Sequence, residues 1–147
     1  MGKPDLLAGQ RVYLDTNVFI YALEGLSEWS QISTALFQAI DAGTCEAVTS
    51  ELALCECLVK PFQMGREDIA QVYINALQSR RFFSVVPVSR EVLVEAARLR
   101  SQRLTLPDAI HAATAIRTNC RCFLTNDDRF RSVKAIQVAK LNGLAGS

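Results

Sequence analysis

The chain has 147 residues, a formal net charge of +1, and 50% hydrophobic against 21% charged residues, which is the composition of a folded globular protein. The balanced charge excludes a basic surface over the whole molecule, so any contact with nucleic acid must be local. No apolar run approaches the roughly 20 residues that a membrane helix needs, and the first residues lack the apolar core of a signal peptide. We therefore expect one cytoplasmic domain over residues 1–147 with no membrane contact, an N-terminal extension at 1–10 and a frayed tail at 141–147.

Strand and helix patterns alternate along the chain. Short apolar runs bounded by polar residues predict four strands and a possible fifth, at 12–14, 47–49, 82–86, 122–125 and 135–138. Apolar residues at helical spacing predict helices between them, at 18–23, from Ser27 or Ser30 to 41, and at 51–59, 66–77, 89–99 and 109–118. This alternation predicts an α/β fold with three layers, α/β/α, around a mostly parallel sheet of four to five strands.

The predicted helix at 51–59 is apolar on nearly every side, which is typical of a buried helix. Pro61 is expected to stop it, because the residue before a proline is biased away from helical geometry. The helix carries Cys55 and Cys57, two of five cysteines. An odd count excludes a framework in which every cysteine is paired, and Cys-x-Cys spacing on a helix, the pattern that contains Cys55 and Cys57, points the two thiols apart. We therefore expect buried reduced thiols rather than a zinc site.

Three predicted strands end in small polar residues. These ends are Leu14-Asp15-Thr16-Asn17, Val48-Thr49-Ser50 and Leu124-Thr125-Asn126-Asp127. Right-handed crossovers keep parallel strands pointing the same way, so the three ends share one edge of the sheet. That edge is where ligands bind in open α/β sheets. The structural alternative is that Asp15 or Asn17 only caps the following helix.

Two further carboxylates could reach the same edge. Asp108 opens the helix after Thr105, and Glu56 lies within the apolar helix, where a buried carboxylate is costly without a cation or hydrogen-bond donors. Each acid has a structural alternative: Asp108 could complete a capping arrangement with Thr105, Asp127 and Asp128 could be residues of a helix start, and Glu56 could point outward. We do not favour the interpretation in which all of these alternatives hold at once, because the acids converge on one edge of the sheet.

Several carboxylates packed together repel each other unless a cation holds them. Oxygen ligands without a requirement for Cys or His favour Mg²⁺ or Mn²⁺ over zinc. Sites of this kind carry out phosphoryl chemistry, in which the cation activates water and stabilises the attacking and leaving oxygens. The residues therefore predict metal-dependent hydrolysis of a phosphodiester.

The chain also resembles the PIN domains, and within them the VapC-type toxins of toxin–antitoxin pairs. Four ordered segments carry the resemblance, Leu14 to Asn17, Thr49 to Glu56, Leu106 to Ala113 and Leu124 to Asp127. The resemblance implies a metal-dependent endoribonuclease that acts on RNA, with a parallel sheet. It also implies a homodimer and a cognate antitoxin protein whose tail blocks the site.

The resemblance maps the acidic metal site onto four residues, Asp15, Glu56, Asp108 and Asp127, with Thr16, Asn17 and Thr125 as supporting polar groups. Under this hypothesis the first three acids hold one Mg²⁺ or Mn²⁺ ion, and Asp127 binds it through water or helps a second ion. Asp128, beside Asp127, leaves open which of the two is the last ligand.

His111, one turn after Asp108, is expected near the site in a core or supporting role. RNA must be held by local basic groups, and the candidates lie in the clusters at 80–81, 98–103 and 129–134, with Arg80, Arg81, Arg103 and Arg129 as the specific candidates. The alternative function is an inactive PIN scaffold that only binds RNA or a protein. The presence of all four acids argues against that alternative.

Overall fold

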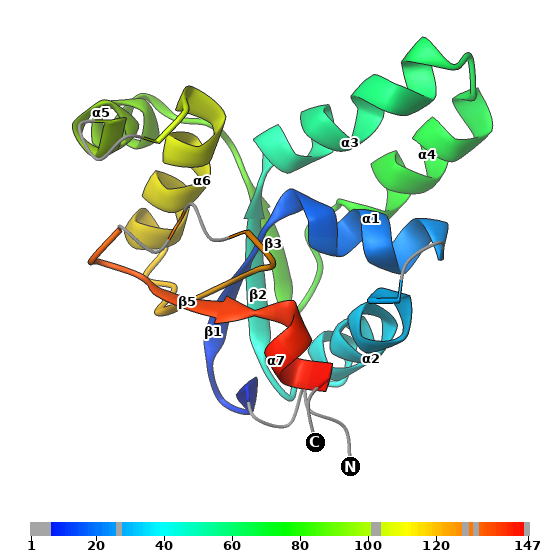
Figure 1. Cartoon of the computed structure of the whole chain (residues 1–147), viewed down its shortest axis with the longest axis horizontal. Helices are drawn as coiled ribbons and strands as arrows, with labels where there is room; N and C mark the ends of the chain where they lie inside the picture. The colour runs from blue at the N-terminus through cyan, green and yellow to red at the C-terminus, as the bar shows by residue number, and fades with distance from the viewer. Residues whose placement is uncertain (1–6, 26–27, 101–103, 128–129, 131–132, 146–147) are drawn as a thin grey trace.

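The computed structural model describes residues 7–25, 28–100, 104–127, 130 and 133–145. A sheet of five strands in the order β3-β2-β1-β4-β5 forms its centre (Figure 1). The strands are β1 (Arg11–Leu14), β2 (Glu46–Ser50), β3 (Phe83–Val86), β4 (Cys122–Thr125) and β5 (Gln137–Lys140). Every neighbouring pair is parallel. The predicted three-layer α/β fold is thus confirmed, with a sheet that is parallel throughout.

Helices cover both faces of the sheet. They are α1 (Thr16–Glu24), α2 (Ser30–Asp41), α3 (Glu51–Gln63), α4 (Glu67–Ala76), α5 (Arg90–Leu99), α6 (Leu106–Arg117) and α7 (Leu141–Ala145). In Figure 1, α5 and α6 lie on one side of the sheet, and α1 to α4 lie on the other. No helix in the part of the chain that the structure describes is long and apolar enough to cross a membrane.

The central strand β1 shows how the two cores form. Successive side chains of a strand point to opposite faces, so Val12 and Leu14 pack into one core with α1 and α2, whereas Tyr13 packs into the other with α5 and α6. On that second side the ring of Tyr13 stacks on Phe123, with 5.0 Å between ring centroids. The residue after Leu14 is therefore at the end of the central strand, with both faces of the sheet covered.

The helix ends agree with the capping residues that the sequence offers. Asp15, Ser50, Ser89 and Thr105 are the N-caps of α1, α3, α5 and α6, and each accepts a hydrogen bond from a backbone N–H of the first turn. Asp15 rather than Asn17 caps α1. Gly25 ends α1 with φ of 66°, a left-handed conformation that glycine adopts without strain.

The prediction that Pro61 stops the helix after Ser50 was wrong. Helix α3 continues to Gln63, and the backbone N–H of Met64 still donates to the carbonyl of Lys60 at 3.0 Å. Proline removes one helical hydrogen bond, but here it lies in the last turn and its ring is buried. Burial of the apolar ring offsets the lost bond.

The prediction that α3 is buried on every side was also wrong. Cys55 is exposed, and Val59 and Phe62 are 49% and 50% exposed. Figure 1 shows the reason: α3 and α4 run side by side away from the sheet, so only one flank of α3 is covered. The expectation of buried reduced thiols holds for Cys57 but not for Cys55.

Described residues near both ends of the chain contribute to the core. Strand β5 lies two residues later than expected, and the segment expected to fray forms α7, in which Leu141 and Leu144 are buried. Leu7, from the extension that received no role, is buried in the same core as these leucines. Apolar residues from near the two ends of the chain thus pack into the same core.

Candidate active site

Asp15 follows the central strand β1 at the point where the strand order reverses. The chain proceeds from β1 to β2 and β3 on one side and to β4 and β5 on the other, which is the switch point where open α/β sheets bind ligands. The side chain is only 7% exposed. Its Oδ1 accepts a hydrogen bond from the backbone N–H of Thr16 at 2.8 Å, and its Oδ2 accepts one from Oγ1 of Thr125 at 2.6 Å. Burial is the main cause that raises the pKa of Asp15, and the Thr125 hydroxyl acts in the opposite direction.

Glu56 reaches the same place from α3. Its side chain is 34% exposed, and its Oε1 accepts a hydrogen bond from Oγ1 of Thr16 at 2.8 Å. The same oxygen lies 2.6 Å from Nε2 of His111. Thr16 therefore links two of the predicted acids, because its backbone N–H donates to Asp15 and its hydroxyl donates to Glu56.

Thr125 makes the corresponding link to the end of β4. Its Oγ1 donates to Asp15 and accepts a hydrogen bond from the backbone N–H of Asp127 at 2.9 Å. The neighbouring carbonyl of Asn126 accepts a hydrogen bond from Nζ of Lys140 at 3.1 Å. Two threonines thus connect Asp15, Glu56 and the backbone of Asp127 by hydrogen bonds.

Asp108 arrives on α6, whose residues from Asp108 to Ala115 are all buried. It lies in the first turn, is 8% exposed, and its backbone N–H is 3.4 Å from Oγ1 of the capping residue Thr105. The expected capping arrangement is therefore present. His111 comes three positions after Asp108, which places both on one face of the helix, the face from which His111 contacts Glu56.

His111 is 2% exposed and contacts the site directly. Its Nδ1 lies 2.6 Å from the hydroxyl of Tyr13, and its Nε2 lies 3.3 Å from Oγ1 of Thr16 besides contacting Glu56. The sequence placed His111 near the site in a core or supporting role. The structure gives it both properties, since it is buried and hydrogen-bonded to one of the predicted acids.

The remaining predicted site residues lie elsewhere or outside the description. Asn17 is exposed on the first turn of α1. Arg80 and Arg81 precede β3, so they lie at the amino edge of the sheet, away from the acids. There Nε of Arg80 donates to Asp41 at 2.9 Å, and both guanidinium groups lie over phenylalanine rings. Asp128, Arg103 and Arg129 lie outside the described residues.

Lys140 is a basic residue at the acidic edge that the sequence analysis missed. It is the last residue of β5 and pairs in register with Thr125. The sequence contained a signal for this placement, because a lysine at the carboxyl end of a strand that pairs beside Thr125 must lie at the same edge of the sheet as Asp15. It was missed because the expected strand ended at residue 138.

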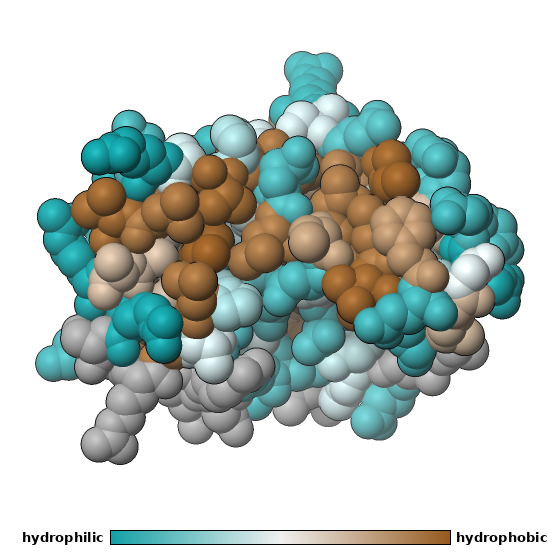
Figure 2. Space-filling view, turned by 90° about the horizontal axis from the view of Figure 1, so that it is seen from above, coloured by the Kyte–Doolittle hydropathy of each residue, from teal (hydrophilic) through white to brown (hydrophobic). Residues whose placement is uncertain are grey.

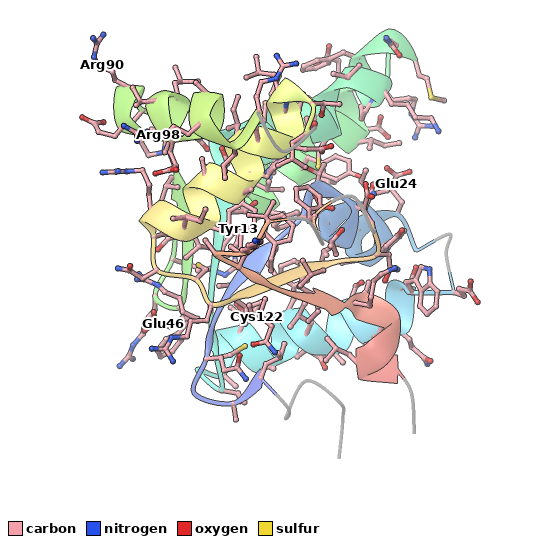
Figure 3. All side chains as sticks on the ribbon, turned by 60° about the vertical axis from the view of Figure 1, so that its left-hand side comes forward. Tyr13, Glu24, Glu46, Arg90, Arg98 and Cys122 are labelled. Carbon is pink, nitrogen blue, oxygen red and sulfur yellow. The ribbon has the colours of Figure 1, made fainter. Side chains whose placement is uncertain are left out.

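The amino and carboxyl edges of the sheet lie at opposite ends of β1. In Figure 3, Tyr13 lies inside the molecule between the sheet and α6, whereas Glu46 and Cys122 lie toward the amino edge. No three His, Cys, Asp or Glu side chains of the described chain are close enough together to hold a metal ion. The acids thus share an edge without forming a coordination sphere in this structure. In ligand type they fit a hard cation, because the donors are carboxylate oxygens and Asp15 is buried against neutral hydrogen-bond donors.

Comparison with known proteins places this arrangement in a family. The PIN domain family matches residues 12–136. Among solved structures, the chain is similar to VapBC2 from Rickettsia felis bound to a promoter DNA fragment, with 16% identity, a TM-score of 0.69, and coverage of 89% of this chain and 98% of that chain. It is also similar to VapC20 of Mycobacterium tuberculosis, a toxin that cleaves the sarcin–ricin loop, with 13% identity, a TM-score of 0.68, and coverage of 84% and 95%.

A toxin–antitoxin complex from Klebsiella pneumoniae is a third similar structure, with 20% identity, a TM-score of 0.62, and coverage of 88% of this chain and 97% of that chain. Curated protein sequences yield no match. At these identities the solved structures establish the fold alone, whereas the family match spans most of the chain. The chain therefore belongs to the PIN domain family, and its fold is that of the VapC toxins.

Proposed function

We propose that the protein is a Mg²⁺- or Mn²⁺-dependent endoribonuclease and the toxin of a toxin–antitoxin pair. The observation that carries this proposal is the environment of Asp15. It is a buried carboxylate at the switch point of the sheet, and its hydrogen bonds from the described chain come from a threonine N–H and a threonine hydroxyl, both neutral. A buried carboxylate charge favours a cation nearby.

Asp15, Glu56 and Asp108 would hold the cation, with Asp127 as a further ligand directly or through water. The cation would supply activation of water and stabilisation of negative charge at the phosphate. The residues around it keep the carboxylates in place: Thr16 holds Asp15 and Glu56 relative to each other, and Thr125 holds Asp15 relative to the backbone of Asp127. Both threonines therefore act by orientation.

RNA is the proposed substrate, and single-stranded or looped segments are the form that fits an edge site of this kind. Lys140 supplies a positive charge at the acidic edge, where its Nζ contacts the Asn126 carbonyl. Arg80 and Arg81 have no part in this proposal, because they lie at the other edge of the sheet. The fold neighbour VapC20 cleaves an RNA loop, which supports the substrate class.

An antitoxin protein is the proposed partner, and one of the similar structures is a toxin–antitoxin complex by name. An apolar pocket of about 360 Å³ between α1, α2 and α4 is a candidate surface for it. Phe19, Leu23 and Phe37 are among the side chains that line the pocket. Co-expression with the protein encoded just upstream tests this surface: a stable complex is expected for the wild type, and Ala22→Glu, in the pocket lining, should abolish it. Equal capture of both forms would contradict the location.

A homodimer is the proposed assembly. Seen from above, Figure 2 shows apolar side chains gathered on both sides of the upper face. Exposed apolar residues of the described helices include Phe62 on α3 and Leu93 and Val94 on α5. Exposed apolar patches of this kind mark interaction surfaces. Light scattering should give twice the chain mass for the wild type and the monomer mass for Phe62→Asp, and a monomeric wild type would contradict the proposal.

Cleavage of a defined RNA tests the proposed activity. A looped RNA incubated with the purified protein should be cut in Mg²⁺ or Mn²⁺ and left intact in excess EDTA, with cleavage restored when the metal is added back. Cleavage at the same rate in EDTA would contradict the metal dependence. The alternative, an inactive PIN scaffold, predicts RNA or protein binding with no cleavage under any metal condition.

A further inference from the structure

The buried contact between Tyr13 and His111 ends on one of the proposed metal ligands. The hydroxyl of Tyr13 lies 2.6 Å from Nδ1 of His111, and Nε2 of the same ring lies 2.6 Å from Oε1 of Glu56. Tyr13 is fully buried and His111 is 2% exposed. The three side chains come from β1, α6 and α3, so they connect the sheet to a helix on each of its faces.

The contact with Glu56 decides one of the protons in this chain of contacts. An ionised carboxylate only accepts, so the nitrogen facing Glu56, Nε2, must carry a proton. The other nitrogen, Nδ1, contacts the Tyr13 hydroxyl, which can donate or accept. Burial raises the pKa of Tyr13 well above its ordinary value, which keeps the phenol protonated as this arrangement requires.

We propose that Tyr13 and His111 are a positioning pair for Glu56: the Tyr13 hydroxyl contacts Nδ1 of the His111 ring and fixes the orientation of the ring, and the Nε2–H of that ring holds the Glu56 carboxylate in place for the cation. The inference rests on the proposed metal site. Outer hydrogen-bond partners orient metal ligands, and their loss commonly costs about 10- to 100-fold in metal affinity. Glu56 needs such a partner because its side chain is long and one-third exposed.

Thr16 also donates to Oε1 of Glu56, but its contribution differs from that of the ring. Thr16 lies in the first turn of α1 beside Asp15. The His111 ring contacts Tyr13 on the side opposite Glu56, and the two rings pack edge to face with 5.8 Å between their centroids. The ring is therefore fixed at both nitrogens. Removing the Tyr13 hydroxyl should loosen the ring without adding or removing a charge.

The first measurement reads the ring directly. His111 is the single histidine of the chain, so its two nitrogen resonances can be assigned without ambiguity in a ¹⁵N spectrum of the metal-free protein at pH 7.5. We expect an N–H signal at Nε2, and we expect Tyr13→Phe to shift the Nδ1 signal. A bare-nitrogen signal at Nε2 in the wild type would overturn the proposal.

The second measurement is the affinity for Mn²⁺ by calorimetry. Tyr13→Phe should weaken binding about tenfold, and the matched control Tyr73→Phe should not, because the buried Tyr73 hydroxyl donates to Glu24 instead. His111→Leu should weaken binding at least as much, and His111→Gln, which keeps an N–H donor, should recover part of it. Equal affinities of wild type and Tyr13→Phe would overturn this inference alone. A wild type that takes up no Mn²⁺ would overturn the proposed function and this inference with it.

Discussion

The two edges of the sheet handle their acidic residues in opposite ways. At the amino edge, Asp41 is paired with Arg80 and Glu46 with Arg11, and the side chains of both acids are more than half exposed. At the carboxyl edge, Asp15 is buried and accepts hydrogen bonds from two threonines. Both edges belong to the same strands, so the difference arises from the residues that follow each strand.

The difference separates structural charge from functional charge. An exposed ion pair in water contributes little to stability, typically about 0–1 kcal/mol, and it leaves both charges hydrated and satisfied. A buried carboxylate held by neutral donors keeps its charge at a cost, and such groups cluster at functional sites. The carboxyl edge is therefore where chemistry is expected.

The largest expected effect comes from replacing one carboxylate oxygen of Asp15 by an amide nitrogen. Asp15→Asn should lower the RNA cleavage rate at least about 100-fold, because a metal site supplies several kcal/mol of transition-state stabilisation. Asp41→Asn, the matched change at the amino edge, should leave the rate unchanged. Single-turnover cleavage of a looped RNA in Mg²⁺ measures both, and equal rates for the two variants would remove the contrast between the edges.

A second change tests the threonine links by stability. Thr125→Val keeps the shape of the side chain but removes the hydroxyl that donates to Asp15 and accepts from the N–H of Asp127. Loss of these two hydrogen bonds beside a buried carboxylate should lower the free energy of unfolding by about 1–3 kcal/mol. Urea unfolding of the metal-free protein measures the loss, and an unchanged midpoint would mean that Thr125 does not hold the site together.

The pH dependence of stability gives a smaller effect with a defined sign. Burial raises the pKa of Asp15 in the folded state. Above this raised pKa the buried, ionised carboxylate lowers the stability of the metal-free protein. The loss of stability disappears as the pH falls through the raised pKa and the carboxylate takes up a proton. Asp15→Asn should therefore be more stable than the wild type at pH 7 in EDTA, and the advantage should shrink as the pH falls toward 4. Thermal unfolding at both pH values measures this, and a pH-independent difference would contradict the pKa shift.

The smallest effect is expected at the amino edge. Arg80→Gln removes the ion pair with Asp41 and should lower the free energy of unfolding by less than about 1 kcal/mol, because both side chains are well exposed. Urea unfolding in low and high salt provides the measurement. A loss comparable with that of Thr125→Val would show that the amino-edge charges are more than surface pairs.

The sequence predicted the fold well because short-range patterns decide it. Apolar runs ending in polar residues located β1, β2 and β4, and capping residues such as Ser50 and Thr105 located the starts of α3 and α6. The exposed flank of α3 could not be predicted, since it depends on how far α3 and α4 extend beyond the sheet. Periodicity reports which residues are apolar and does not report which of them find a neighbour.

The sequence suggested the acids of the proposed site but not the contacts that connect them. Strand ends and the family resemblance both indicated Asp15 and Asp127, and the expectation of a buried charge indicated Glu56, whose side chain is in fact one-third exposed. The contacts that join them are between residues far apart in the sequence, such as Thr125 with Asp15 or His111 with Glu56. Such pairs depend on the register of β1 against β4 and on the rotation of α6, which a single sequence does not specify.

Calorimetric titration with Mn²⁺ tests the central claim most directly, because it asks whether the carboxyl edge holds a cation. Wild type and Asp41→Asn should take up the ion with the same affinity, and Asp15→Asn should lose the uptake. A wild type that binds no Mn²⁺, or an Asp15→Asn variant that binds it as the wild type does, would contradict the account.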